Sequence, residues 1–140
     1  MVIVPRAVAA HITRHAETTY PEECCGLLLG HDEGTRGIVV TTSVASANLA
    51  DDRRHRFEID PALYLKLLRA SDAGDERLIG LYHSHPDGVA EPSAVDCADA
   101  WEEDWVWLIL SVIEGRAGPP SAFRLTALGG PFEALGVEFT

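Results

Sequence analysis

The segment RLIGLYHSHPDGVAEPSAVD, residues 77–96, carries the most specific structural information in this chain. Its first nine residues are mainly apolar and predict a buried β-strand. Because side chains alternate along a strand, His83 and His85 project in the same direction at its end. Pro86 ends the strand, and the following DGVAEP predicts a loop that returns the chain to the same place. Ser93 and Asp96 then begin a short helix with the spacing of a capping box.

Two imidazoles and a carboxylate at one strand end form a candidate metal site. Two neutral histidines and one aspartate are three protein ligands for Zn²⁺, and they leave the fourth tetrahedral position for water. Each half alone has an ordinary explanation, a surface or core histidine and a helix cap. With 6 His, 7 Ser and 10 Asp in 140 residues, however, H-x-H-x7-S-x2-D has a chance expectation of roughly one in a thousand. The combination therefore favours a catalytic zinc site.

A water activated by zinc also needs a base that takes and returns its proton. Among twelve glutamates, Glu23 opens an otherwise wholly apolar strand, CCGLLLG, where a charge is costly unless it faces a polar cavity. The pattern alone leaves a second interpretation open, in which Glu22 and Glu23 form the solvated end of a strand.

The other segments predict one α+β, or mixed α/β, domain over residues 1–140, with helices on a curved sheet. Pro5 suits the first turn of a helix to about Thr19, and Asp60 with Pro61 predicts the start of another, to about Ala73. We expect a third helix over about 93–102, and Trp101, Trp105 and Trp107 in the core. The expected strands are 23–30, 37–45, 56–59, 77–85, 105–113, 121–127 and 132–139, the first two as a hairpin.

Composition excludes several classes of protein. The formal charge of −11 repels nucleic acid and anionic membranes, and no apolar run approaches the about 20 residues of a membrane span. The N-terminus has no secretion signal, so we expect a cytoplasmic protein. Cys24, Cys25 and Cys97 match neither a disulfide framework nor a four-cysteine zinc site, which predicts reduced thiols. The basic RRHR, residues 53–56, predicts a solvated loop neutralised by its neighbours, with a small anion-recognition patch as the alternative.

Three segments together resemble the JAMM (MPN+) metallopeptidase family, in particular its small, stand-alone prokaryotic members. They are PEECCGLLLG (21–30), LIGLYHSHPDGVAEPSAVD (78–96) and WVWLILSV (105–112), and the likeness covers nearly the whole chain in order. The resemblance implies a curved, mostly antiparallel sheet flanked by helices, of the cytidine-deaminase-like type. This fold agrees with the α+β architecture expected from the residues.

The resemblance also implies a role for each residue of the motif. The zinc ligands are His83, His85 and Asp96. Glu23, rather than Glu22, matches the catalytic acid/base through the pattern proline-x-Glu-x-Cys-Gly. Ser93 matches the serine that orients the water and helps to stabilise the tetrahedral intermediate.

The implied reaction is zinc-dependent hydrolysis of the amide bond after the C-terminal glycine of a ubiquitin-like or sulfur-carrier protein, with release of an amino acid such as cysteine in the small bacterial members. A glycine-rich tail suits a narrow groove and can add to a strand edge. Arg53, Arg54 or Arg56 is a candidate to hold a carboxylate of the released portion. Two alternatives stay open: a non-catalytic binding scaffold, and a thiol enzyme that uses Cys24 or Cys25.

Overall fold

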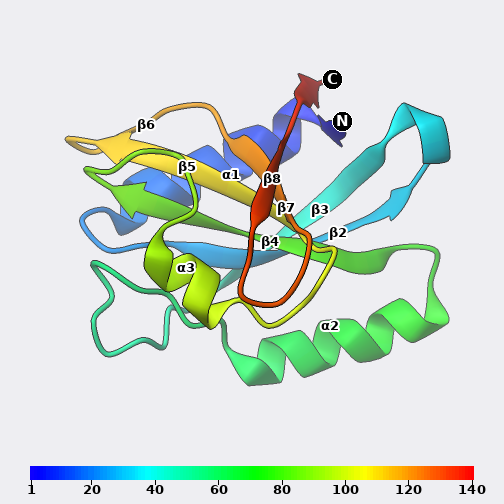
Figure 1. Ribbon diagram of the computed structural model, residues 1–140, viewed down its shortest axis with the longest axis horizontal. Helices are drawn as coiled ribbons and strands as arrows, with labels where there is room; N and C mark the ends of the chain where they lie inside the picture. The colour runs from blue at the N-terminus through cyan, green and yellow to red at the C-terminus, as the bar shows by residue number, and fades with distance from the viewer.

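The computed structural model describes the backbone of residues 1–140 and the side chains of all but residues 72 and 73. Nine strands form one sheet with the order β8-β7-β5-β4-β2-β3-β1-β9, and β6 pairs with β5 (Figure 1). The strands are β1 (Val2–Val4), β2 (Cys25–Asp32), β3 (Ile38–Ser46), β4 (Arg77–Pro86), β5 (Val106–Ile113), β6 (Arg116–Ala117), β7 (Ser121–Leu125), β8 (Phe132–Leu135) and β9 (Val137–Phe139). The helices are α1 (Arg6–Thr19), η1 (Gly34–Arg36, a 3-10 turn), α2 (Pro61–Ala73) and α3 (Ala94–Asp99).

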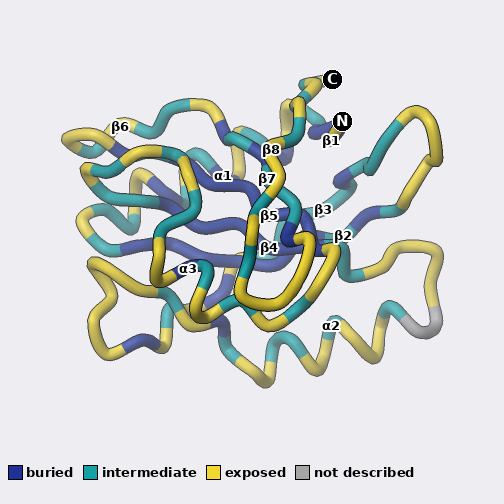
Figure 2. Tube along the Cα trace, viewed as in Figure 1, coloured by how far each residue is buried: buried dark blue, intermediate teal, exposed yellow. Residues whose placement is uncertain are grey.

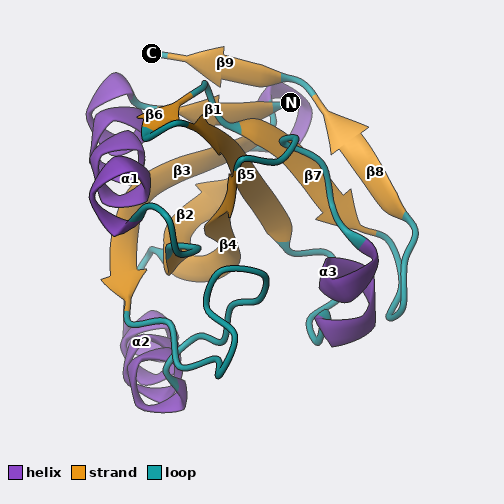
Figure 3. Ribbon diagram, turned by 90° about the vertical axis from the view of Figure 1, so that its left-hand side faces the viewer, coloured by secondary structure: helices purple, strands orange, loops and turns teal.

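The sheet is strongly curved and nearly closes on itself. Only Gly136 separates β8 from β9, yet β8 pairs with β7 and β9 pairs with β1. Residues 132–139 therefore connect the two ends of the strand order (Figure 3). The pairing is antiparallel except that β4 runs parallel to β5 and β1 runs parallel to β3 and β9. This architecture confirms the expected α+β fold with a curved, mostly antiparallel sheet.

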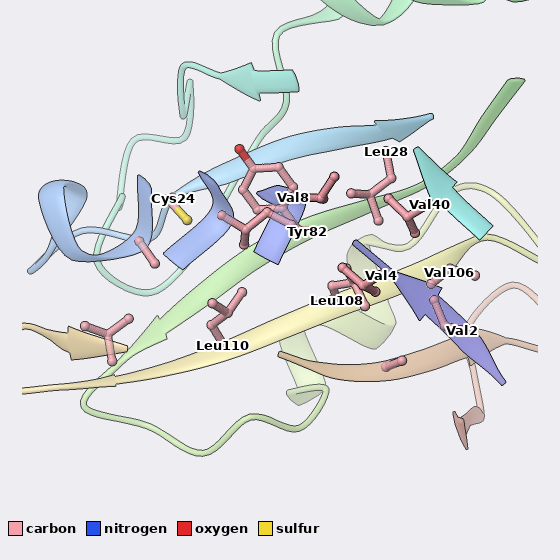
Figure 4. Close-up of a cluster of buried hydrophobic side chains, with 14 residues drawn as sticks. Val2, Val4, Val8, Cys24, Leu28, Val40, Tyr82, Val106, Leu108 and Leu110 are labelled. Carbon is pink, nitrogen blue, oxygen red and sulfur yellow. The ribbon is translucent and has the colours of Figure 1, made fainter. Parts of the chain in front are cut away.

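Two apolar clusters hold the layers together. The first contains buried residues of α1 and of the strand faces toward it, including Val8, Leu28, Tyr82 and Leu108 (Figure 4). The second lies on the α2 side and includes Leu27, Leu81 and Trp107. The central strands are thus buried on both faces, whereas much of α2 remains exposed (Figure 2). None of the helices, as far as they are described, is long and apolar enough to span a membrane.

The structure confirms the two longer helices and the hairpin, and it corrects four expectations. Residues 132–139, expected as one strand, form β8 and β9 on either side of Gly136, because the two halves pair with opposite ends of the sheet. Residues 56–59 form no strand; Ile59 makes only an isolated bridge to Asn48, and the backbones of Arg56 and Glu58 are hydrogen-bonded to the Asn48 side chain instead of to a strand. The short helix ends at Asp99 and not near Glu102. Trp101, expected in the core, is 44% exposed, although Trp105 and Trp107 are buried as expected.

The loop from residue 47 to residue 58, here called the 47–58 loop, is organised by the Asn48 side chain. Its Nδ2 donates to the carbonyl oxygens of Glu23 (3.1 Å) and Arg56 (2.9 Å). Its Oδ1 accepts hydrogen bonds from the backbone nitrogens of Ala50 and Glu58, both at 3.0 Å. One amide group, with its full hydrogen-bonding capacity used, thereby connects both ends of this loop to the segment before β2.

Gly26 allows the close approach of the ring that precedes His83 in β4. Gly26 pairs with Tyr82, whose fully buried ring would overlap a Cβ placed on Gly26. We expect Gly26→Ala to lower the free energy of unfolding by about 1–3 kcal/mol, because the ring must shift inside a packed core. Urea unfolding measures this change. Gly74→Ala is the control, since its Cβ would meet only ordinary contacts of 3.6 Å or more; equal stability of the two variants would contradict the expectation.

Candidate metal centre

Strand β4 brings His83 and His85 together on one face of the sheet. His83 lies between Cys25 of β2 and Ile109 of β5, so its backbone is fixed by pairing on both sides. The Nε2 atoms of the two histidines are 3.0 Å apart. His83 is fully buried, whereas His85 is 12% exposed at the end of the strand. The expected convergence of the two imidazoles is therefore present.

Helix α3 supplies the carboxylate through its first turn. Ser93 is the N-cap, and the predicted capping box is complete: the Asp96 nitrogen donates to Ser93 Oγ (3.0 Å), and the Ser93 nitrogen donates to Asp96 Oδ2 (2.9 Å). The same Oδ2 lies 3.1 Å from the Nε2 atom of each histidine. The cap thus fixes the orientation of the carboxylate toward the two rings.

These three atoms fit the face of a tetrahedral metal site. They form a triangle with edges of 3.0, 3.1 and 3.1 Å. Ligand atoms at about 2.0 Å from a tetrahedral Zn²⁺ are about 3.3 Å from one another, so only a small adjustment is needed. His85 Nδ1 donates to the Val89 carbonyl oxygen at 2.8 Å, so a metal that displaced the proton from Nε2 would find the lone pair of this nitrogen directed at the cluster. A cation would satisfy all three lone pairs at once.

Aromatic rings hold the imidazole of His83 in place. The ring of Phe57 stacks on it with centroids 4.3 Å apart, and Trp107 contacts it edge-on at 5.4 Å. Phe57 comes from the 47–58 loop and Trp107 from β5, so the ring is held from two elements. Both rings also line a cavity of about 650 Å³, together with Tyr64 and the exposed Trp101. This aromatic cavity is next to the candidate metal centre.

Glu23 lies in the segment just before β2 rather than within the strand, and it is 4% exposed. Its backbone nitrogen donates to the Arg53 carbonyl oxygen at 2.7 Å, opposite the Asn48 contact to its own carbonyl. One carboxylate oxygen belongs to a cluster with ring nitrogens of His83 and His85, all within 4.8 Å of one another. The interpretation of Glu23 as a solvated strand end is therefore wrong.

The two carboxyl groups near the histidines have opposite electrostatic environments. The pKa of Glu23 is raised to about 8, chiefly by burial; His85 opposes this shift, and the nearby charge of Asp96 adds to it. Burial also opposes ionisation of Asp96, but hydrogen bonds from His83 and His85 hold the pKa of Asp96 well below its usual range. Asp96 is thus a permanent anion suited to a cation, and Glu23 can exchange a proton.

The histidines are affected by burial in different degrees. Burial lowers the pKa of His83, which favours the neutral ring that a metal requires. For His85, burial acts in the same direction, but its hydrogen bonds to Asp96 and the Val89 carbonyl raise the pKa overall. Two buried atoms of the site, Glu23 Oε1 and His83 Nδ1, find no hydrogen-bond partner among the described side chains. These two atoms are therefore available for hydrogen bonds to a bound ligand or water.

The structure brings the five candidate residues into one region, together with supporting groups that the sequence analysis did not identify. Asn48, Phe57 and Trp107 each contact a site residue from a distant part of the chain. Asn48 stands in an irregular stretch where no spacing distinguishes it from other loop residues. The sequence predicts a strand at Phe57 and a core position for Trp107, but a contact with one particular ring has no sequence signal.

Comparison with known proteins gives a consistent family. Residues 5–126 match the family model described as prokaryotic homologs of the JAB domain. The chain is 31% identical to the desampylase of Haloferax volcanii over 105 residues (75% of this chain, 73% of the relative). It is 32% identical to the CysO-cysteine peptidase of Mycobacterium tuberculosis over 128 residues (89% and 83%). It is 34% identical to a probable TtuB-protein conjugate cleaving protease of Thermus thermophilus over 121 residues (84% and 72%).

Solved structures agree on the fold. A protein of Desulfitobacterium hafniense, known from a solution structure, superposes with a TM-score of 0.84 at 24% identity and covers 100% of this chain and 93% of its own. The family model spans the segments before β2, at the end of β4 and at the start of α3, where the candidate residues lie. The resemblance expected from the sequence motifs is confirmed, and the chain belongs to the family of prokaryotic homologs of the JAB domain.

Proposed function

We propose that this chain is a zinc-dependent hydrolase that cleaves the amide bond after the C-terminal glycine of a ubiquitin-like or sulfur-carrier protein. The metal ligands are His83, His85 and Asp96, the proton carrier is Glu23, and Ser93 assists at the carbonyl oxygen. The observation that carries the proposal is the triangle of two Nε2 atoms and Asp96 Oδ2, all within 3.1 Å, with the buried Glu23 beside it. Membership of the family supports it independently.

Asp96 rather than Glu23 is assigned as the third ligand on geometry. Asp96 Oδ2 is equally close, at 3.1 Å, to both Nε2 atoms, whereas the cluster that contains Glu23 extends to 4.8 Å. The longer separation leaves room for a water between Glu23 and the ligands. Zn²⁺ bound to these ligands would supply a Lewis acid that lowers the pKa of water and polarises the amide carbonyl.

Glu23 carries the proton between water and the leaving nitrogen. Its carboxylate accepts a proton from the attacking water and then donates it to the nitrogen of the breaking amide bond. The pKa of about 8 is that of Glu23 when no metal is bound. A cation at the neighbouring ligands would lower this pKa and so favour the carboxylate form, which accepts the proton. A buried carboxyl group, one oxygen of which has no hydrogen-bond partner among the described residues, is able to perform both steps.

Ser93 contributes a hydrogen-bond donor next to the ligands. Its Oγ accepts the hydrogen bond from the Asp96 nitrogen, so its own O–H remains available to donate. We assign this O–H to the oxygen of the substrate carbonyl, on which negative charge develops in the transition state. Because the N-cap position fixes Ser93, the donor is already in place before substrate binds.

The names of the relatives support the substrate class. They describe a CysO-cysteine peptidase and a protease that cleaves TtuB-protein conjugates. The first name implies an amino acid as leaving group and the second a conjugated protein. We transfer to this chain what the two have in common, the cleavage of a bond formed by a small carrier protein.

The alternatives are less well supported. It costs free energy to keep a carboxylate buried beside two histidines when one of its oxygens has no hydrogen-bond partner among the described residues. A non-catalytic scaffold has no need of such a group. A thiol enzyme requires a thiolate, but burial raises the pKa of Cys24 to about 11 and that of Cys25 to about 12. Chelators should therefore abolish hydrolysis of carrier-protein adducts, and thiol-alkylating reagents should not.

Removal of a metal ligand should abolish tight zinc binding. We expect the wild type to bind one zinc per chain. Loss of a residue that only hydrogen-bonds to a metal ligand typically lowers metal affinity about 10- to 100-fold, and we expect His85→Ala and Asp96→Asn to lower it by more than this. Metal analysis after dialysis and the zinc-dependent rise in melting temperature measure this. His31→Ala, at a partly exposed histidine of β2, is the control; undiminished zinc in both ligand variants would contradict the assignment.

Replacement of the proton carrier should separate binding from turnover. Glu23→Gln should retain one zinc and lose about 10²- to 10⁴-fold in kcat, because the amide cannot carry the proton. Hydrolysis rates on a carrier-protein adduct, measured together with metal content, test it. Glu138→Gln in β9 is the matched control at an exposed glutamate. Wild-type turnover by Glu23→Gln would place the base elsewhere.

Removal of the serine hydroxyl should reduce kcat without loss of metal. In Ser93→Ala the backbone nitrogen still donates to Asp96 Oδ2, so the ligand stays oriented. We expect kcat to fall about 10²-fold or more, as for other oxyanion donors, while zinc remains near one equivalent. Ser93→Thr keeps the hydroxyl and should recover most of the rate. Loss of zinc in Ser93→Ala would mean that the serine acts only through the helix cap.

A further inference from the structure

A cavity of about 360 Å³ has Glu23 in its wall but none of the three candidate metal ligands. It shares no lining residue with the aromatic cavity on the Phe57 side of the site. Its volume lies at the lower end of the about 300–1,000 Å³ of small-molecule sites. Its polar lining comes from α1, from the segment before β2 and from the end of β3 with the following loop, and includes His15, Thr19, Glu22, Ser46, Asn48 and Arg53.

The position of Glu23 indicates which part of a substrate this cavity takes. A group that returns a proton to the leaving nitrogen must lie within about 2.6–3.2 Å of it. The atoms bonded to that nitrogen therefore lie on the Glu23 side of the metal ligands. Glu23 Oε1 is buried without a hydrogen-bond partner among the described residues, and an N–H group of a ligand would satisfy it.

Arg53 gives this cavity a cationic group next to Glu23. The Arg53 carbonyl accepts the hydrogen bond of the Glu23 nitrogen at 2.7 Å, so the two backbones are joined. Its Nε donates to Glu22 Oε2 at 3.2 Å, which is the one hydrogen bond of this guanidinium to any described side chain. The two terminal amino groups of the half-exposed side chain are free to form the paired hydrogen bonds that a carboxylate accepts.

We propose that this cavity is the leaving-group subsite and that its ligand is a single α-amino acid, with the nitrogen at Glu23 and the α-carboxylate at Arg53. The inference rests on the proposed function and names its leaving group. In an α-amino acid the carboxylate is only two bonds from the nitrogen, so neighbouring residues can recognise both. The lysine side chain of a conjugated protein carries no carboxylate near its nitrogen and would leave Arg53 unused.

The reaction at this subsite is hydrolysis. The water oxygen adds to the carbonyl carbon of the terminal glycine, and the bond from that carbon to nitrogen breaks. Glu23 gives the proton that it took from the water to the nitrogen as this bond breaks. The second proton of the water passes from the carboxyl group of the glycine to the released amine, so the products are a carboxylate and an ammonium group.

The other arginines of the RRHR segment are placed differently. Arg56 Nη2 contacts the carboxylate of Asp99 at 2.9 and 3.1 Å and lines the aromatic cavity. Arg54 is exposed and lines neither cavity. Of the three candidates, Arg53 alone shares a cavity with Glu23.

A matched pair of substrates tests the subsite. A small ubiquitin-like sulfur-carrier protein is prepared with serine or with ethanolamine in amide linkage to its C-terminal glycine. The two adducts differ only in the α-carboxylate, and neither has a thiol that would bind zinc. We expect the zinc-loaded wild type to prefer the serine adduct by roughly tenfold to a hundredfold in kcat/KM, the range for hydrogen bonds to charged groups.

Arg53→Gln should remove this preference. In this variant kcat/KM for the serine adduct should fall to the value for the ethanolamine adduct, and kcat/KM for the ethanolamine adduct should equal that of the wild type. Arg54→Gln, the matched control from the same loop, should keep the preference. NMR titration of free serine into the metal-free protein gives a second readout that does not depend on turnover, and Arg53→Gln should weaken this binding.

Three results would overturn the subsite: no preference in the wild type, an equal loss on both adducts in Arg53→Gln, or an undiminished preference in that variant. An equal loss would mean that Arg53 acts only through the Glu23 backbone. Failure of the wild type to hydrolyse either adduct, with zinc bound, would instead refute the proposed function and the subsite with it.

Discussion

The candidate site depends on one oxygen atom, Asp96 Oδ2. It accepts the hydrogen bond of the Ser93 nitrogen and lies at equal distance from the two histidine nitrogens. The helix cap and the metal triangle therefore use the same atom, and neither can change without the other. Two hydrogen bonds between Ser93 and Asp96 fix the first turn of the helix. A helix of only six residues is therefore sufficient to hold the Asp96 carboxylate in place.

The two carboxyl groups of the candidate site have pKa values that are shifted in opposite directions. Asp96 and Glu23 are both buried, yet the pKa of Asp96 is lowered and that of Glu23 is raised to about 8. The difference comes from hydrogen bonds: Asp96 accepts them from two imidazoles and a backbone nitrogen, and one oxygen of Glu23 has none from the described side chains. Groups whose pKa values are separated in this way typically serve as fixed anion and proton carrier.

The sequence predicts the groups that act chemically better than the groups that position them. Local rules give the strand with His83 and His85, the capping box and the hairpin, because periodicity and cap spacing act over a few residues. They fail for 56–59, where an alternation typical of a strand lies in a loop held by Asn48, and for Trp101, whose exposure depends on where α3 ends. Contacts across the chain, such as Phe57 on His83, follow from tertiary packing and leave no trace in spacing.

The 47–58 loop connects all parts of the site, although it contains none of the proposed ligands. Through Asn48 and the Arg53 carbonyl it holds the backbone of Glu23, and through Phe57 it supports the ring of His83. Through Arg56 it reaches Asp99, three residues after Asp96. The sheet fixes the histidines, and this loop adds contacts to the backbone of Glu23 and to the ring of His83. A ligand that binds to the loop would therefore act on the reacting groups directly, which makes the loop the natural place for recognition of the leaving group.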